Sequence, residues 1–365
     1  MESLEPASAP LPSFWGKGLG DGGRIALFMN LRFYLLRRIA LIVPTLIGLS
    51  ILTFSIARLV PGDPVGLAAG PQATAEIKEA LRREFGLDQP LPVQYINYMA
   101  GLFRGDWGQS LYTRRDVLPD LQTFWPATLE LTTIAVIIAT LLGVPAGVIS
   151  AMYRNRMPDH IARILSLFFV SFPAFWLAMI FQTWFGRDLG MFPINKRLPV
   201  LVAPPATTTG LFLIDSLIQL DFETFLISLK HIFVPSLVLS FSAFASITRI
   251  TRASMVEALE KDFVRMERAI GIPYRIIIFK YVLRNAFIAT ITVISLNFGW
   301  LMAGAILIET IFDWPGLGLY AVHASLSLDF QPIMGIAFLY GVVFSLINIL
   351  TDMVYGILDP RIRYG

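Results

Sequence analysis

The chain has 365 residues, of which 55% are hydrophobic and only 15% are charged, and its net charge is +3. A soluble domain of this length rarely has such a composition, and repeated apolar runs of about twenty residues indicate a polytopic membrane protein. The small net charge does not argue for nucleic-acid binding, and the absence of cysteine excludes disulfides, thiolate nucleophiles and cysteine-ligated metals. The three histidines are far apart in sequence and are not spaced as a metal site.

The first sixty residues predict a leader followed by a membrane span. Residues 1–30 combine proline, serine and glycine with few periodic apolar positions, so we expect a mostly disordered leader. No basic region leads directly into an apolar core with a cleavage site, which excludes a secretory signal. Arg37 and Arg38 precede the first span, at about 39–60, and paired basic residues favour the cytoplasmic side.

The longest polar stretch, 61–125, predicts a small extracytoplasmic cap. A helix is expected from Thr74, a suitable N-cap, to Phe85, and a second helix over 93–103. A glycine-punctuated, irregular loop follows at 105–110. Because both helices have an apolar face, we expect them to pack rather than to move freely.

Five further apolar segments complete an all-α pattern of six spans. They cover about 127–152, 161–185, 232–247, 286–311 and 333–357. Gly143 and Gly147 form a small-xxx-small pair that permits close helix packing. Pro173 is expected to bend the third span. Before the fourth span we expect an interfacial turn at 210–215 and a short helix at 222–230.

The distribution of basic residues predicts the orientation. The loops at 153–160 and 249–284 hold two and eight basic residues, whereas the opposite-side loop at 312–332 holds none. Positive loops stay in the cytoplasm. Six spans then place both termini in the cytoplasm.

The basic loop at 249–284 contains an amphipathic pattern. Apolar residues recur at steps of three and four, as on one face of a helix: Val256, Leu259, Phe263, Met266 and Ile270. Glu257 and Lys261 stand in the favourable i,i+4 order, Gly271 is a natural stop and Pro273 prevents continuation. Such a helix has three possible positions: on lipid headgroups, on its own protein, or on a separate partner.

Motifs across the chain carry a family resemblance. They lie, in order, at 35–38, 60–64, 105–110, 125–130, 209–215, 249–271, 283–286, 309–318 and 359–361. With these motifs the chain resembles the inner-membrane permease subunits of bacterial ATP-driven peptide importers, in particular the first permease subunit of dipeptide and oligopeptide systems. The resemblance covers nearly the whole chain from about residue 31.

The resemblance implies a type I ABC importer permease fold over 31–365, in the bacterial cytoplasmic membrane. It implies half of a pathway for short peptides, shared with a second homologous permease. Two ATP-binding subunits would bind ATP and Mg, and a substrate-binding protein would dock outside. This chain would be no enzyme and would bind no cofactor. Consistent with this, the sequence has no Gly-x-x-x-x-Gly-Lys-Ser/Thr phosphate loop.

In this family the loop at 249–284 carries a coupling helix that docks on the ATPase. The residues that the resemblance places there are Val256, Glu257, Leu259, Asp262, Phe263, Arg265, Met266, Ile270 and Gly271. The chain departs from the family at Glu267, where a small residue is usual, and at Ile270, where lysine is frequent. Both departures bear on how this loop fits a particular ATPase.

Polar side chains inside spans are candidates for the pathway, because hydrocarbon penalises them. Asn297 and Asn348 are the residues that we assign this role, with interhelical bonding as the alternative. Glu130 and Asp352 lie near span ends, where interhelical bonds or a surface position are expected. Glu309, at the outer end of the fifth span, is expected either to face water or to meet the binding protein.

Two other functions compete with peptide import. Permeases for nickel and other small solutes are similar and are weakly separated by this sequence. An intramembrane hydrolase would need a serine with a histidine or lysine partner, or paired aspartates, deep in the spans. The sequence places no histidine and no aspartate pair there.

Overall fold

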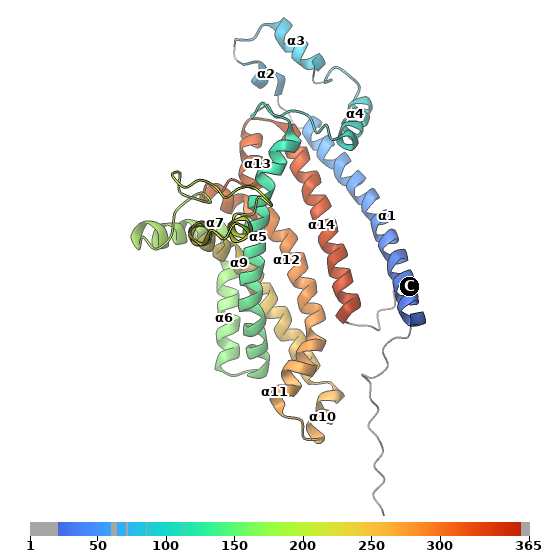
Figure 1. Cartoon of the computed structure of the whole chain (residues 1–365), viewed down its shortest axis with the longest axis vertical. Coiled ribbons are helices and arrows are strands. Elements are labelled where there is room, and N and C mark those ends of the chain that lie inside the picture. The colour runs from blue at the N-terminus through green and yellow to red at the C-terminus, as the bar shows by residue number, and fades with distance from the viewer. Residues whose placement is uncertain (1–20, 60–63, 71, 85, 112, 359–365) are drawn as a thin grey trace, which may run out of the picture.

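The computed structural model is almost entirely helical and describes residues 21–59, 64–70, 72–84, 86–111 and 113–358 (Figure 1). The N-terminal half holds α1 Asp21–Leu59, α2 Pro64–Ala69, α3 Ala75–Glu84, α4 Leu91–Arg104, α5 Val117–Met152, α6 Met157–Ser171, α7 Ala174–Phe181 and the π-helical η1 Gln182–Asp188. The C-terminal half holds α8 Phe212–Ile218, α9 Phe222–Leu259, α10 Asp262–Ala269, α11 Tyr274–Ile276, the π-helical η2 Ile277–Val282, α12 Leu283–Ile311, α13 Leu317–Leu326 and α14 Phe330–Leu358.

The helical spans confirm a polytopic membrane protein. In the described residues, five helical stretches are long and apolar enough to cross a membrane, and a bent pair makes up to six. The five are Arg37–Leu59, Val117–Met152, Phe222–Leu259, Tyr274–Ile311 and Phe330–Val354. The bent pair joins Met157–Ser171 to Ala174–Asp188.

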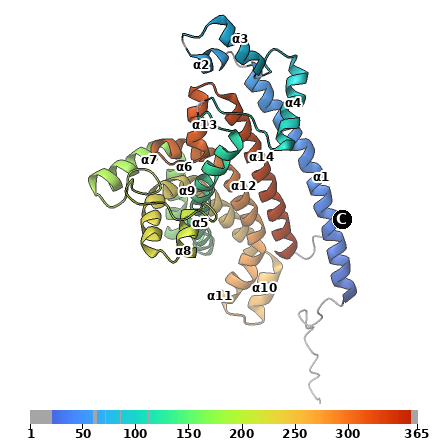
Figure 2. The same cartoon turned by 45° about the horizontal axis from the view of Figure 1, so that its top comes forward.

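The third predicted span is broken rather than merely bent. The two halves meet at an angle of 96°, and the second half extends sideways from the bundle in both views (Figures 1 and 2). The break follows from Pro173, which has no backbone N–H and disfavours helical geometry in the residue before it. Phe172 accordingly is extended, with φ −100° and ψ 137°. The prediction of a single spanning helix at 161–185 is therefore corrected.

The fourth span is longer than the sequence predicts. The short helix expected at 222–230 and the span expected at 232–247 form one helix, α9, which continues to Leu259. Asp221 caps its start by accepting a bond of 3.0 Å from the Thr224 backbone N–H. Part of the interfacial turn expected at 210–215 is likewise helical, as α8.

The cap contains both predicted helices, α3 and α4, together with the short α2, and α4 rests on α1. Thr74 precedes α3 and accepts a bond of 3.4 Å from the Ile77 backbone N–H, which confirms its expected position. The rings of Tyr95 and Tyr98 on α4 lie 5.4 and 6.0 Å from the Phe54 ring on α1. The cap helices α2 to α4 gather at one end of the molecule, opposite α10 and α11 (Figure 1).

The N-terminal prediction is corrected in part. α1 begins at Asp21, so residues 21–30 are helical and do not form the disordered leader that we expected. Residues 1–20 and 359–365, which include the motif at 359–361, lie outside the described residues.

The core is centred on the packing of α5 against α9, and the two small residues of α5 make this possible. A Cβ added at Gly143 would lie 3.2 Å from the Phe244 carbonyl oxygen on α9. One added at Gly147 would lie 2.8 Å from the Thr248 carbonyl oxygen and 2.6 Å from the Thr251 Cβ. The predicted small-xxx-small contact is thus confirmed.

We expect Gly147→Ala to separate α5 from α9 and to destabilise the protein by about 1–3 kcal/mol, the usual cost of overpacking. The thermal unfolding midpoint in detergent measures this effect. Gly304→Ala on α12 is the matched control, because the nearest atom to its added Cβ is 3.8 Å away. Equal midpoints for the two variants would contradict the close approach of the helices.

Candidate functional site

The amphipathic stretch at 256–270 is divided between two helices and does not form one. α9 ends at Leu259, and α10 begins at Asp262 after a break at Glu260 and Lys261. The prediction of one continuous amphipathic helix from 256 to 270 is therefore wrong. Its expected stop is correct, because Gly271 adopts a left-handed φ of +81°, which glycine tolerates best.

The predicted apolar stripe divides between the bundle and the surface. Three residues of the stripe are partly buried: Val256, Leu259 and Phe263. They pack on a hydrophobic cluster formed by the C-terminal ends of α5 and α9 together with η2. By contrast, Met266 and Ile270 are 65% and 64% exposed. The alternative in which this stripe packs on its own protein thus holds for three of its five residues.

Val264, which the sequence reasoning missed, is the buried anchor of α10. It is only 1% exposed and belongs to the same cluster as Met255 of α9 and Ile277 of η2. A single buried residue gives no periodic signal in a helix of eight residues, and this explains why Val264 was missed. The anchor fixes α10 so that Met266 and Ile270 point away from the bundle.

The charged residues around the start of α10 pair locally, and Met266 and Ile270 stay exposed. Glu257 pairs with Lys261 at 3.2 Å, and Asp262 pairs with Arg265 at 3.3 Å. These residues are exposed, so the pairs contribute little stability. Glu267 is partly buried, whereas Ile270 is exposed, so only the second family departure lies fully on the surface.

A buried carboxylate ties this end of the bundle together. Asp159, at the start of α6, has no exposed surface. It accepts bonds from the Ser150 hydroxyl at 2.6 Å and from the Asn155 backbone N–H at 2.8 Å. Arg252 of α9 donates two more, at 2.7 and 2.8 Å. Asp159 therefore links α5, the loop at 153–156 and α6 to α9, the helix that precedes α10.

The pathway candidates occupy different environments. Asn297 of α12 donates to the Ser246 hydroxyl of α9 at 2.8 Å and to the Val293 carbonyl oxygen at 2.7 Å, so its amide joins two helices. Asn348 is partly buried in α14. Asp352 pairs with Arg38 at 2.6 Å, which confirms an interhelical bond. These contacts do not bring Asn297 and Asn348 together.

The Glu309 side chain is exposed neither to solvent nor on a surface that a binding protein could contact. It is fully buried, and its carboxylate accepts bonds from the Thr128 hydroxyl and the Gly318 backbone N–H, both at 2.6 Å. The Leu319 N–H donates a third at 3.0 Å. Both expected roles for Glu309 are therefore corrected: it holds the start of α13 against α5 and α12.

A second buried network confirms the interhelical reading of Glu130. Its carboxylate accepts bonds of 2.6 Å from Arg197 and 2.7 Å from the Leu213 backbone N–H. Nearby, burial alone would raise the pKa of Asp215, but hydrogen bonds from Thr209, Gly210 and Thr208 outweigh it, and the pKa lies below its ordinary value. The loop before α9 is thus fixed by carboxylates.

Among the described residues, no group of three or more histidine, cysteine, aspartate or glutamate side chains is placed to hold a metal ion. The buried carboxylates instead hold helices and loops together. The long apolar helices define a class: a polytopic helical membrane protein.

Comparison with known proteins gives the family. The model for binding-protein-dependent transport system inner membrane components matches residues 143–364, and the model for their N-terminal part matches residues 30–132. The chain belongs to this family of multi-pass inner-membrane permeases. These are transport components, as the resemblance implied.

Three relatives illustrate the similarity. The probable D,D-dipeptide transport system permease protein DdpB of Escherichia coli K12 is 42% identical over 87% of this chain and 94% of its own length. The dipeptide transport system permease protein DppB of Alkalihalophilus pseudofirmus is 40% identical over 91% and 99% of the two chains. The glutathione transport system permease protein GsiC of Escherichia coli K12 is 35% identical over the same shares, 91% and 99%.

Proposed function

We propose that this chain forms half of the translocation pathway of an ATP-driven importer of short peptides. The family membership supports the permease role, and the names of the relatives, which refer to dipeptides and glutathione, support peptides as the substrate class. A nickel or other small-solute importer is the alternative. The chain itself is no enzyme in this proposal and binds no cofactor.

The observation that carries the proposal is the exposed apolar tip of α10. Met266 and Ile270 leave two large apolar side chains uncovered at the end of the bundle farthest from the cap (Figure 1). A groove on an ATPase subunit would bury them, with Asp262, Arg265 and Glu257 orienting the contact from the rim. In this proposal the partly buried residues Val256, Leu259 and Phe263 pack on the bundle and hold α10 in place, and they do not contact the ATPase. Gly271 follows α10 and ends the docking segment.

The orientation in this proposal places α10 in the cytoplasm. The start of α1 and the end of α14 lie toward the same end as α10 and α11, whereas α2 to α4 lie at the other end (Figures 1 and 2). Positively charged loops favour the cytoplasm. Both termini would then be cytoplasmic, with 249–284 as the coupling loop and 61–125 as the extracytoplasmic cap of the 31–365 permease domain.

The partners follow from this arrangement. A second homologous permease would complete the pathway, two ATPase subunits would bind ATP and Mg, and an extracytoplasmic binding protein would deliver the peptide. ATP-driven closure of the ATPases would favour one of two states of the bundle through differential contacts at α10. Asn297 bridges α9 and α12, so we assign it to positioning those helices, and Asn348 stays the pathway candidate.

Reconstitution with the partner subunits in liposomes tests the function. We expect ATP-dependent uptake of radiolabelled di- and tripeptides that requires the binding protein, and no uptake of nickel under the same conditions. Nickel uptake without peptide uptake would instead establish the alternative. Uptake that continues without ATPase subunits would exclude the proposed mechanism for either solute.

A further inference from the structure

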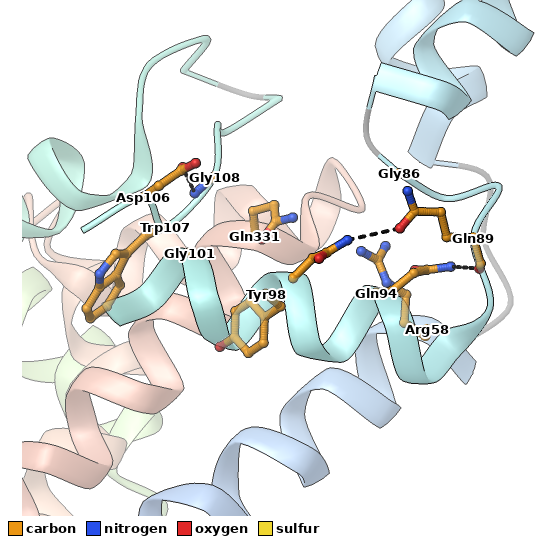
Figure 3. A pocket seen from close by; sticks show the side chains of 11 residues that line it. Arg58, Gly86, Gln89, Gln94, Tyr98, Gly101, Asp106, Trp107, Gly108 and Gln331 are labelled. Carbon is orange, nitrogen blue, oxygen red and sulfur yellow. Dashed lines mark hydrogen bonds between the residues drawn. The ribbon is translucent and has the colours of Figure 1, made fainter. Parts of the chain in front are cut away.

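A groove lined by three arginines lies between α6 and α9, near the end of the bundle that carries α10 and α11 (Figure 1). Its volume is about 290 Å³, and its described lining holds Arg163 of α6 with Arg249 and Arg252 of α9 but no carboxylate. The pocket under the cap differs, because Asp106 lines it together with Arg58 (Figure 3). Charged side chains of a single sign therefore line the groove.

Small residues keep the groove hollow. They include Ser150 of α5, Ser166 of α6 and Ala253 of α9. The Ser166 hydroxyl donates to the Ala162 carbonyl oxygen at 2.8 Å. The Ser150 hydroxyl donates to the buried carboxylate of Asp159 at 2.6 Å. Because both serine hydroxyls are already engaged as donors, recognition of an anionic ligand falls to the arginines.

Both helices present arginine at one end of the groove and apolar residues at the other. Along α6, Arg163 is followed by Leu167 and Val170 at steps of four and three, which keeps them on one helix face. Along α9, which ends where α6 begins, Ala245 precedes Arg249 by four residues. Val170 lies about 10 Å beyond Arg163 along α6, at about 1.5 Å per residue. The groove thus has a basic mouth and an apolar inner part.

The arginines lie close together and keep N–H groups for a ligand. The Nε atoms of Arg163 and Arg252 approach one oxygen, Asp159 Oδ1, to 3.5 and 2.7 Å, and Arg249 precedes Arg252 by almost one helical turn. Within the described part of the chain, no hydrogen bond engages the Nη1 of Arg163 or Arg252, and no hydrogen bond or ion pair involves Arg249. The Arg163 and Arg252 side chains are 49% and 22% exposed, so they are not sealed in the core. One buried carboxylate stands against three cations.

We propose that this groove binds an anionic phospholipid of the leaflet next to α10. The headgroup phosphate accepts charge-assisted bonds from Arg163 and Arg252 at the basic mouth, where Arg249 adds a third positive charge. One acyl chain follows Leu167 and Val170, which are exposed on α6. A free phosphate would satisfy the arginines but leave this apolar part uncovered, so the groove fits a lipid better than a soluble anion.

The position and the size of the groove agree with a lipid ligand. Further apolar residues on α6, among them Ile164 and Phe168, are exposed, as expected for a helix that contacts hydrocarbon. The volume is near the lower limit of ligand pockets, about 300 Å³, so the headgroup and the first part of one chain occupy it. In the proposed orientation this is the cytoplasmic leaflet, where basic pockets between membrane helices bind anionic headgroups. Only the choice of leaflet rests on the proposed function.

Native mass spectrometry of the full-length chain in detergent measures lipid binding. We expect dioleoyl phosphatidylglycerol to bind at least about fivefold more tightly than dioleoyl phosphatidylcholine, because only the first has a net negative charge. Arg249→Gln should weaken phosphatidylglycerol binding by about fivefold. Ala253→Leu, which keeps every charge and fills the groove, should weaken it as well. Arg275→Gln on α11 is the control that should leave binding unchanged, because this arginine is exposed at the same end of the bundle but does not line the groove.

A photoreactive acyl chain locates the bound lipid. Phosphatidylglycerol with a diazirine in one chain is irradiated with the assembled transporter in nanodiscs, and the labelled peptides are mapped. We expect the label on α6 between Arg163 and Val170, and a lower yield of it in Arg249→Gln. Lipid bound at random around the bundle would instead label the spans without preference and would not respond to Arg249→Gln, which would overturn the proposal.

Three other results would also overturn the proposal. Equal binding of the two lipids, or unchanged binding by both Arg249→Gln and Ala253→Leu, would show that the groove does not recognise the headgroup. Displacement of phosphatidylglycerol by millimolar inorganic phosphate would assign the basic mouth to a soluble anion. Labelling of α6 in the isolated chain but not in the assembled transporter would show that the second permease covers the groove. The proposed function would stand in each case, because peptide uptake is measured separately.

Discussion

Replacing both Met266 and Ile270 by aspartate is expected to release the ATPase subunits from this permease while leaving its fold intact. Each fully buried apolar side chain stabilises a contact by about 1.5–3 kcal/mol. Loss of both therefore corresponds to about 100-fold or more in affinity. Co-purification of the ATPase subunits and peptide-stimulated ATP hydrolysis in liposomes measure the effect.

The exposure of each side chain decides which residue is a suitable control for the α10 double variant. Phe263 is partly buried against the cluster around Val264, so an aspartate there would disturb the fold as well as the contact. Ile96 on α4 is 63% exposed, close to the 65% of Met266 and the 64% of Ile270, but lies in the cap. Ile96→Asp should keep the ATPase subunits bound. If the α10 double variant stays fully coupled, ATPase docking occurs elsewhere and α10 faces lipid or solvent.

Asp159→Asn is expected to destabilise the protein by about 3 kcal/mol. The change removes the charge that Arg252 contacts twice, and each hydrogen bond to a charged group contributes a net stabilisation of about 1.5–3 kcal/mol. Arg252 is still 22% exposed, so water relieves part of the loss. The thermal midpoint in detergent and the midpoint of an SDS titration measure this effect.

A double-mutant cycle separates the ion pair from general damage. Asp159→Asn and Arg252→Gln together should cost clearly less than the sum of the single changes, because each residue loses the same partner. Asp262→Asn, whose carboxylate is almost fully exposed, should leave both midpoints unchanged. Additive single effects would mean that Asp159 stabilises the loop at 153–156 rather than the contact with α9.

The sequence predicted the long elements because their signals are local. Apolar runs identified the spans, Thr74 identified the start of α3, and Gly143 with Gly147 identified a close helix contact. The break at Pro173 was predicted as a bend only, because the size of a bend depends on neighbours that the sequence does not position. The continuous α9 was missed because its first ten residues, 222–231, include polar side chains such as Lys230 and resemble a separate surface helix.

The site was predicted in outline only. The periodic stripe from Val256 to Ile270 indicated an amphipathic helix, but the same pattern arises when one helix ends and another continues the apolar side. Which residues face the bundle depends on long-range contacts such as that of Val264 with Ile277. Asp159 gave no signal, because its partner Arg252 is distant in sequence and only the folded bundle brings them together.

The length of α9 gives this permease a mechanical property. Its 38 residues span about 57 Å at about 1.5 Å per residue. One end is capped by Asp221, and the other end is joined to α10 by Glu260 and Lys261. A tilt of about 5° about one end moves the other by about 5 Å over such a length. A displacement of α10 by about 5 Å therefore requires α9 to tilt by only about 5°. Pro235, which supplies no backbone donor, is where this helix can bend.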